Sequence, residues 1–440
     1  MQHRTASRGE IFSWTLFDFA NTGFYVIIIS LLYSTFFTDV IANGNASYWG
    51  RTISASMLLT AIVGPLLGSI SDATHRKKRF LALFTGLCVA ATALLSFTGP
   101  GMLMMAAALV ILANVGFEGG TIFYDAFLPD IAAEQDYNRV SGYGFAMGYL
   151  GSFVILMIVL PLVTPAALPP VAQSSPAVAL AGLSARGAVG YAAALPSLRL
   201  TDLIAAAFFA LFSLPLFLFV RERQTPRAIA GNPLAAGYRR LRETFAHIRS
   251  YDAVKRFLLA FFVYNDSILT VILFAGIFAK ESLKMETAQL IYFFMIVQGS
   301  ALIGSLIFGA LGNRIGARQS IIITIVIWIG VVVGAYFITT AGSFFILGAV
   351  AGIALGSSQS CSRSLMALLT PDEKRTEFFG FYDGFFGKAS AVVGPLVFGE
   401  VADWLGLRQA MLVIGVIFVL GILLLLRVPD ARVMEPAAAA

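Results

Sequence analysis

Long apolar segments separated by short polar connections dominate the pattern along this chain. Each segment approaches the roughly 20 residues that an α-helix needs to cross a bilayer. The pattern therefore predicts an all-α membrane protein with twelve transmembrane helices. The predicted spans lie near residues 12–37, 50–72, 80–99, 101–125, 141–163, 200–220, 256–280, 287–311, 319–340, 343–369, 376–402 and 405–427.

The first apolar segment follows Arg4 and Arg8, an arrangement that also occurs in secretory signal peptides. This segment is longer than a signal-peptide core, carries Asp18 and lacks a small-residue cleavage site. We therefore expect it to be retained as the first transmembrane helix.

A basic connection between the second and third spans sets the predicted orientation. It contains four consecutive cations, Arg76, Lys77, Lys78 and Arg79. Lys and Arg in short loops remain on the cytoplasmic side of a membrane. An even number of spans then predicts that both termini are cytoplasmic.

The composition agrees with a membrane protein. The 440 residues are 58% hydrophobic and 12% charged, whereas soluble domains carry about 25% charged residues. The formal net charge is +6, but most of the 30 Lys and Arg residues fall in segments predicted to face the cytoplasm. We therefore interpret the charge as inside-positive bias and expect no nucleic-acid partner.

Weak internal repeats divide the chain into two halves. The stretch from Gly64 to Arg79 returns in weakened form from Gly309 to Arg318. Leu128-Pro129-Asp130 after the fourth span matches Thr370-Pro371-Asp372 after the tenth. Tandem halves related by an axis along the membrane normal are typical of one transporter architecture. We expect two pseudo-symmetric six-helix bundles, residues 1–220 and 256–440, joined by a cytoplasmic amphipathic linker, residues 221–255.

The two long connections differ in character. Residues 164–199 are rich in Ala, Pro and Ser and predict a loose outer loop. In residues 221–255, Asn232 and Pro233 are typical of a helix start. Apolar residues then recur every three or four positions among arginines, which predicts a basic helix lying on the inner leaflet. A partner-binding role for this helix stays open. Its apolar residues are Leu234, Tyr238, Leu241, Phe245 and Ile248.

The loop Gly68-x-x-x-Asp72-x-x-x-Arg76-Lys77 resembles the loop motif between helices two and three of the major facilitator superfamily. It departs from that motif at Ala73 and His75. The second copy keeps Arg314 and Gly316 but has Asn313 at the Asp position, which puts a gating ion pair in that half in doubt.

Longer strings resemble the vacuole-effluxer-like family, which includes autophagy-related amino-acid exporters. This resemblance implies export or exchange of a small polar solute, with amino acids as the expected class. The strings are Trp14-Thr15-Leu16-Phe17-Asp18-Phe19-Ala20-Asn21, Phe123-Tyr124-Asp125-Ala126-Phe127-Leu128-Pro129-Asp130, Ser141-Gly142-Tyr143-Gly144-Phe145-Ala146-Met147-Gly148-Tyr149-Leu150-Gly151, Tyr264-Asn265-Asp266, Gln359-Ser360-Cys361-Ser362-Arg363-Ser364-Leu365 and Gly387-Lys388-Ala389-Ser390-Ala391.

Polar side chains inside the predicted spans mark the candidate site for substrate or protons. A charge at mid-bilayer costs about 2.5–3.5 kcal/mol, so these residues must face a cavity or one another. In major facilitators, helices one, four, seven and ten line the central cavity, and most of these residues fall there. The candidate site residues are Asp18, Asn21, Glu118, Asp125, Asn265, Asp266, Gln298, Gln359, Arg363 and Lys388.

Individual roles follow from depth in the membrane. Glu118 or Asp266 is the predicted proton carrier, because a buried acid can bind and release a proton. We expect Lys388 with Arg363 to receive a substrate carboxylate. Asp18, Asp125 and Arg363 lie nearer the cytoplasmic ends, so a gating pair is an equal alternative for them. The predicted gating residues are Asp72, Arg76, Lys77, Asn313 and Arg314.

These observations favour a secondary active transporter that moves a small polar or zwitterionic solute by alternating access, with proton coupling left open. One alternative is a proton-coupled drug or organic-ion exporter, and a second is a transport-inactive membrane sensor. No phosphate-binding loop, His-Glu-x-x-His string or nucleophile elbow occurs in the sequence, so we do not expect an enzyme.

No cofactor, metal site or disulfide is expected, because the two cysteines fall in apolar spans and the three histidines lack partners at ligand spacing. We expect a monomer. The excess of Arg over Lys and the abundant Ala favour a bacterial inner membrane over a fungal vacuole.

Overall fold

The computed structural model describes residues 6–163, 187–223 and 232–429, and the regular elements found there are all helical. The elements of residues 6–219 are α1 (Arg8–Phe24), η1 (Tyr25–Leu31), α2 (Leu32–Phe36), η2 (Phe37–Ile41), α3 (Ala46–Thr74), α4 (Lys77–Leu95), α5 (Leu103–Asp125), α6 (Leu128–Ile131), η3 (Glu134–Asp136), α7 (Tyr137–Val163) and α10 (Gly187–Phe219). The later elements are α11 (Pro233–Ala246), η4 (Ile248–Tyr251), α12 (Asp252–Leu283), α13 (Thr287–Ile315), α14 (Ala317–Phe337), α15 (Ala341–Leu369), η5 (Asp372–Lys374), α16 (Arg375–Phe379), η6 (Gly380–Phe386), α17 (Gly387–Leu405) and α18 (Leu407–Leu425).

These helices confirm the predicted membrane architecture of twelve spans. In the described part of the chain, 11 helical segments are long and apolar enough to cross a membrane. The remaining crossing is the helical run formed by α16, η6 and α17, in which η6 is a π-helical stretch between the two α-helices. The described part of the chain is thus all-α, with twelve helical segments that can cross a membrane.

One predicted connection is wrong in part. The loose outer loop expected over residues 164–199 ends earlier, because α10 already begins at Gly187. Residues 164–186 lie outside the described part. The helical portion is rich in Ala, the residue with the highest helix propensity, and Pro196 is accommodated inside the helix.

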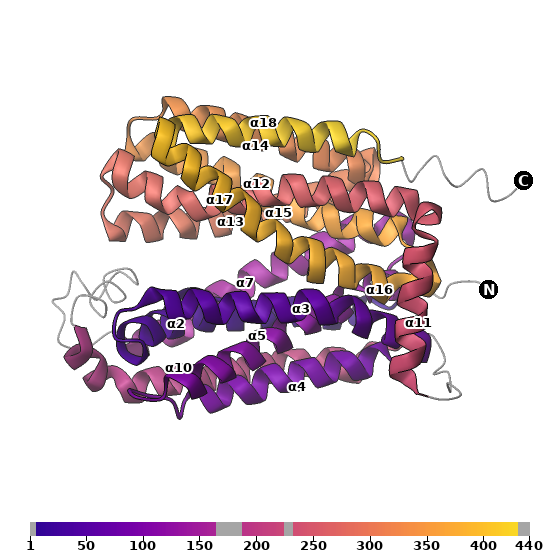
Figure 1. The fold of residues 1–440 in the computed structure, drawn as a ribbon, viewed down its shortest axis with the longest axis horizontal. Coiled ribbons are helices and arrows are strands. Elements are labelled where there is room, and N and C mark those ends of the chain that lie inside the picture. Colours follow the sequence, from indigo (N-terminus) through magenta and orange to yellow (C-terminus); the bar gives the residue numbers. More distant parts are fainter. Residues whose placement is uncertain (1–5, 164–186, 224–231, 430–440) are drawn as a thin grey trace, which may run out of the picture.

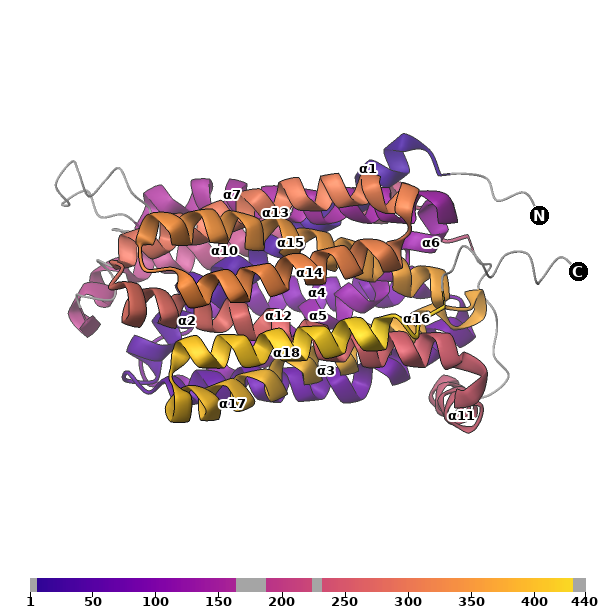
Figure 2. The same cartoon turned by 90° about the horizontal axis from the view of Figure 1, so that it is seen from above.

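Two groups of helices pack side by side along the bundle (Figures 1 and 2). We call the elements from α1 to α10 the N-terminal half and those from α12 to α18 the C-terminal half. The halves meet along two seams: α7 packs against α13 and α15, and α3 packs against α16 and η6. The domain boundaries expected from the sequence stay predictions.

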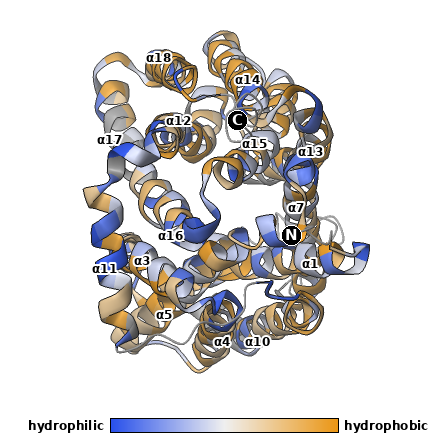
Figure 3. Ribbon diagram, turned by 90° about the vertical axis from the view of Figure 1, so that its right-hand side faces the viewer, coloured by the Kyte–Doolittle hydropathy of each residue, from blue (hydrophilic) through white to orange (hydrophobic). Residues whose placement is uncertain are grey.

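The first residues of α1, the last residues of α18 and the whole of α11 lie at one end of the bundle (Figure 1). We call this the terminus end. Seen from that end, hydrophilic residues lie on α11, on α16 and at the near end of α13 (Figure 3). This distribution agrees with an aqueous face there, which the basic loop predicts to be cytoplasmic.

Helix α11 spans the seam between the two halves at the terminus end. On α3, Ser69 Oγ donates a hydrogen bond of 2.8 Å to the carbonyl oxygen of Gly237. On the other half, the Arg240 guanidinium lies 3.8 Å from the Glu377 carboxylate, and Lys374 donates to Thr244 Oγ1. The helix is amphipathic as predicted, but it also contacts both halves directly.

Close backbone approach at glycines draws the two seams together. A Cβ atom at Gly68 of α3 would collide with the carbonyl oxygen of Thr376, and one at Gly142 of α7 would collide with the carbonyl oxygen of Ser305. Small residues permit such contacts between membrane helices. The Gly64-Pro65-x-x-Gly68 pattern therefore marks a real contact between the halves.

Candidate gating and transport site

One ion pair joins the two halves within the membrane. Lys388 Nζ lies 2.5 Å from Glu118 Oε2, so α17 is linked to α5. The Glu118 side chain is 6% exposed and that of Lys388 is 21% exposed. Both residues lie well inside their helical runs, which matches the depth predicted from the sequence. Neither charge faces lipid unpaired, as the insertion cost requires.

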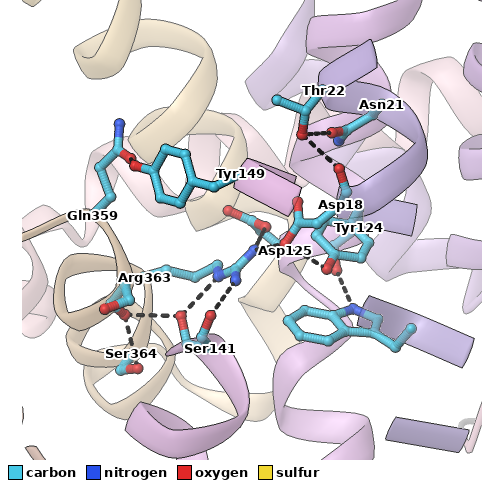
Figure 4. A network of polar contacts seen from close by, with 12 residues as sticks. Asp18, Asn21, Thr22, Tyr124, Asp125, Ser141, Tyr149, Gln359, Arg363 and Ser364 are labelled. Atoms are coloured by element: carbon cyan, nitrogen blue, oxygen red, sulfur yellow. Dashed lines mark hydrogen bonds and ion pairs between the residues drawn. The ribbon is translucent and has the colours of Figure 1, made fainter. Parts of the chain in front are cut away.

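A second cluster surrounds Arg363 of α15. Its Nη1 atom lies 2.8 Å from Asp125 Oδ1 of α5 and 3.2 Å from Asp18 Oδ2 of α1. Its Nε and Nη2 atoms donate to the side-chain and backbone oxygens of Ser141 on α7, at 2.9 and 2.8 Å. Tyr124 donates to Asp18 Oδ2 at 2.8 Å. We call these five residues the Arg363 network (Figure 4).

Aromatic rings enclose this network. The Arg363 guanidinium lies 4.2 Å from the centre of the Phe145 ring and 4.9 Å from that of Trp14. Trp14 also stacks on Tyr124 and donates its indole N–H to the Tyr124 carbonyl. A guanidinium is weakly hydrated and stacks well on aromatic faces, so Arg suits this dry site better than Lys. The Arg363 side chain is only 1% exposed.

Nearer the terminus end, Asp72 of α3 caps the start of α16. Its two carboxylate oxygens accept the backbone N–H groups of Thr376 and Glu377, at 3.1 and 2.8 Å. The first N–H groups of a helix lack partners within the helix and attract negative charge. Asp72 therefore joins the N-terminal half to the C-terminal half, and its gating role stays a prediction.

Asn313 occupies the matching position on the opposite seam. Its Oδ1 atom accepts the backbone N–H of Arg139 in the first turn of α7, at 3.2 Å. Its Nδ2 atom lies 3.5 Å from the carboxylate of Asp136. The sequence left this half of the gate in doubt, because Asn replaces Asp. In the structure, the Asn313 amide accepts a backbone N–H at the start of a helix, as Asp72 does. It also faces the Asp136 carboxylate, which would repel a carboxylate at position 313.

The remaining predicted gating residues are cationic. Lys77 pairs with Asp130 at 2.8 Å inside the N-terminal half. Arg375 of the C-terminal half reaches the same Asp130 carboxylate at 3.4 Å, so the pair extends across the seam. Arg76 is half-buried at the start of α4, and Arg314 is exposed near the end of α13.

Several predicted site residues lie apart from both charged clusters. Asp266 of α12 accepts the backbone N–H of Gly394 at 2.6 Å and lines a small pocket with Ser267 and Thr270. Asn265 Nδ2 donates to Ser390 Oγ at 2.7 Å.

Asn21 is buried in α1, where its side-chain oxygen accepts from Thr22, and Gln298 is half-buried in α13. Gln359 accepts a hydrogen bond of 2.7 Å from Tyr149 across the seam. Among the described residues, the Arg363 network and the Glu118–Lys388 pair are therefore the two charged connections between the halves that lie deep in the bundle.

Lys388 and Arg363, which are predicted to receive a substrate carboxylate together, have different partners in this structure. Arg363 is enclosed by Asp18, Asp125 and Ser141, whereas Lys388 pairs with Glu118 and keeps some exposure. Arg363 thus joins α15 to the N-terminal half in this conformation. The sequence alone places both cations in one site, because spacing along a helix does not show which residue of the other half lies opposite.

Three polar residues in these contacts were not chosen from the sequence as site residues. Tyr124, Ser141 and Tyr149 look like ordinary helix residues, although all three lie in the family-like strings. Asp383 lies inside the eleventh predicted span, so the sequence marks it as an intramembrane acid, but its position gave it no individual role. Within the described residues, no group of three or more His, Cys, Asp or Glu side chains is arranged to hold a metal ion.

These contacts form successive layers across the seam between the halves. Asp72, Asn313 and Arg375 lie towards the terminus end, the Arg363 network lies deeper, and the Glu118–Lys388 pair lies deeper still. Each contact joins the two halves, in addition to the close helix packing along the seams. An arrangement of this kind can open and close one end of the bundle by breaking a limited set of polar contacts.

Comparison with known proteins agrees with this architecture. Residues 40–438 match the family described as vacuole effluxer Atg22 like. The chain is 31% identical over 431 residues to the uncharacterized MFS-type transporter YxiO of Bacillus subtilis, covering 95% of this chain and 94% of that protein. It is 24% identical over 477 residues to autophagy-related protein 22 of Yarrowia lipolytica, covering 88% and 76%.

Solved structures show the same fold. A bacterial homologue of the iron transporter ferroportin, in an outward-facing state, superimposes with a TM-score of 0.67 at 13% identity, covering 96% of this chain and 99% of that one. The transporter FucP in the outward conformation gives 0.64 at 14% identity, covering 96% and 98%. The chain is a multi-pass membrane transporter of the major facilitator type, and it belongs to the vacuole effluxer Atg22-like family.

Proposed function

We propose that this transporter exports a small zwitterionic solute, with amino acids as the expected class, by alternating access. The observation that carries the proposal is the Glu118–Lys388 pair, which holds opposite charges on opposite halves within the membrane. A zwitterion has one group for each of these charges. Entry of the solute between them exchanges the internal ion pair for two new ones, so neither buried charge is left without a partner.

The state described here is then the one closed at the terminus end. Asp72, Asn313 and the Arg363 network join the halves there. With the terminus end in the cytoplasm, as the basic loop predicts, this state is outward-facing. Opening requires that these contacts break together, which couples the binding site to the gate. A proton is the proposed coupling ion.

Ligand-dependent thermal unfolding followed by flux in proteoliposomes tests the proposal. The purified full-length protein is screened against amino acids, small peptides, organic acids and lipophilic cations. We expect stabilisation by members of the amino-acid set, and counterflow of the same compounds. Stabilisation and transport of lipophilic cations alone would instead favour a drug or organic-ion exporter. Binding without flux in any direction would favour a membrane sensor.

Exchanging the charges of Glu118 and Lys388 distinguishes a pair that binds substrate from a pair that is only structural. The single variants Glu118→Gln and Lys388→Gln should abolish flux, because each removes one charge that the zwitterion meets. The double variant Glu118→Lys with Lys388→Glu restores an ion pair but reverses its direction. We expect this variant to fold and to remain inactive. Transport at the rate of the unchanged protein by the double variant would mean that the pair is only structural.

The membrane in which export occurs also belongs to this proposal. The Arg-rich and Ala-rich composition and the similarity to a Bacillus protein support a bacterial cytoplasmic membrane. Fractionation of a tagged chain in its source cells tests that placement. A monomer remains the expected state, and its mass in detergent can be measured by light scattering.

A further inference from the structure

Asp383 lies in the π-helical segment η6, which connects α16 to α17 in one helical run. This segment packs against α3 and α5 of the N-terminal half and against α12 of its own half. π-Helical turns are rare, and they frequently occur at functional sites. Asp383 is therefore an acid placed by an irregular turn on the seam between the halves.

One oxygen of the Asp383 carboxyl group lacks the donor that an ionised carboxylate needs when it is buried. Its Oδ2 atom is fully buried and has no hydrogen-bond partner among the described residues. The other buried acids of this region each have a cationic partner: Glu118 pairs with Lys388, and Asp18 and Asp125 share Arg363. A buried charge without a partner is far more costly than a neutral group in the same place.

The charges around Asp383 also favour a neutral carboxyl group. The charged groups close enough to act on it are Asp125 and Glu118 of α5, Arg363 of α15 and Lys388 of α17. Tyr382 is the neighbouring ionisable residue on η6 and is neutral near pH 7. With Asp18, the region holds four carboxyl groups and two cations. One proton on Asp383 reduces the excess of negative charge without breaking either ion pair.

We infer that Asp383 binds the coupling proton, an inference that rests on the proposed transport function. The neutral carboxyl leaves Lys388 paired with Glu118. When the O–H bond breaks and the proton leaves to water, the carboxylate attracts Lys388, which lies five residues further along the same helical run. Glu118 is then free for the ammonium group of the solute. Protonation from the other side of the membrane reverses these steps, and no electrons are transferred.

Neither acid predicted from the sequence fits this role as well. Glu118 is already paired at 2.5 Å with a cation. Asp266 accepts the N–H of Gly394 at 2.6 Å, and the pocket beside it is lined by Ser267, Thr270 and apolar residues. The Asp266 carboxylate therefore has a donor and lies apart from the seam. Asp383 is the acid whose proton can change the contacts between the halves.

Transport driven by a proton gradient tests the inference in proteoliposomes, with a radiolabelled amino-acid mixture as the probe. We expect Asp383→Asn to lose gradient-driven accumulation at least tenfold while it retains counterflow, which needs no net proton movement. Asp383→Glu should restore accumulation in part. Asp266→Asn is the competing variant and should still accumulate. Glu400→Gln removes an exposed carboxyl from the same helix and is the matched control. Gradient-driven accumulation by Asp383→Asn would overturn the inference.

An infrared measurement tests the proton site without depending on the identity of the solute. The protonated carboxyl of Asp383 should give a carbonyl band at neutral pH in the full-length protein, and this band should be absent from Asp383→Asn but present in Asp266→Asn and Glu400→Gln. Absence of any difference at Asp383→Asn would overturn the proton site. Failure of every amino acid to move in the unchanged protein would refute the proposed substrate class instead, and the infrared result would still decide the proton site.

Discussion

At the scale of single residues, Arg363 shows how much one buried cation can organise. Its planar head has several donors in fixed directions, and it uses them on Asp18, Asp125 and both oxygens of Ser141. These partners come from three helices of the N-terminal half. A lysine has a single ammonium and cannot reproduce the set. The residue therefore joins α15 to three helices at once.

Removal of Arg363 should destabilise the protein strongly. In Arg363→Ala, the carboxylates of Asp18 and Asp125 stay buried without a cation, and loss of one member of a buried pair costs about 3–5 kcal/mol. We expect a clear fall in the midpoint of thermal unfolding in detergent. The second change Asp125→Asn should recover part of the loss. An unchanged midpoint in Arg363→Ala would show that the network adds no stability.

Asn313 provides a second test at this scale. Asn313→Asp restores the residue usual in the family motif but places a carboxylate against that of Asp136. Two like charges about 4 Å apart cost about 1 kcal/mol even in water. We expect about fivefold faster hydrogen exchange of the Arg139 amide, because 1.4 kcal/mol corresponds to tenfold. The added change Asp136→Asn should restore slow exchange. Slower exchange in the single variant would contradict this explanation.

At the scale of elements, the seam between α3 and α16 depends on close backbone contact. In Gly68→Ala, the new methyl group meets the carbonyl group of Thr376, which cannot move without shifting the helix. The helices should separate and weaken the bonds from Asp72 to the start of α16. Hydrogen exchange of the Thr376 and Glu377 amides should therefore accelerate.

The control for this experiment is Gly86→Ala on α4, where the added methyl meets nothing within 4 Å. Ala is the better helix former, so this variant should be neutral or slightly more stable. Equal exchange rates in the two variants would show that the Gly68 contact does not hold the gate closed.

Helix α11 offers another test of an element. Arg240 contacts Glu377 and donates to the carbonyl oxygen of Glu373, whereas its neighbour Arg239 is exposed. Arg240→Ala should free the C-terminal half from α11 and raise proteolytic cleavage within residues 233–246. Arg239→Ala removes the same charge one position away and should leave cleavage unchanged. Comparable cleavage of the two variants would mean that α11 is held by the membrane surface alone.

At the scale of the whole molecule, orientation is the property to measure. Gly342→Cys places a thiol at the end opposite the termini, and Ala246→Cys places one on α11. The native Cys88 and Cys361 are buried and should not react. In intact cells, a membrane-impermeant maleimide should label the first position only, and permeabilisation should expose the second. The opposite pattern would reverse the predicted topology.

Most of the architecture could be predicted from the sequence because it follows from solvation along the chain. The twelve apolar segments predict the spans, and the basic loop after Asp72 predicts their orientation. The repeat of that loop at Asn313 predicts two related halves. None of these predictions needs a long-range contact. The acids and cations inside those segments also mark the candidate region, because a charge in the bilayer needs a partner. Sequence could not show where α10 begins, since its first turns are rich in small residues and are followed by Pro196, a composition that also occurs in loops.

The sequence by itself determined that Arg363, Lys388, Glu118 and Asp18 must be enclosed, because lipid cannot solvate them. Only the tertiary structure decided the pairing: Arg363 with Asp18 and Asp125, and Lys388 with Glu118. Pairing depends on the rotation of helices and on the approach of two halves far apart in sequence, which local spacing does not record. The same approach leaves one oxygen of Asp383 without a donor, which distinguishes Asp383 from Asp18, Asp125 and Glu118 of the two charged clusters.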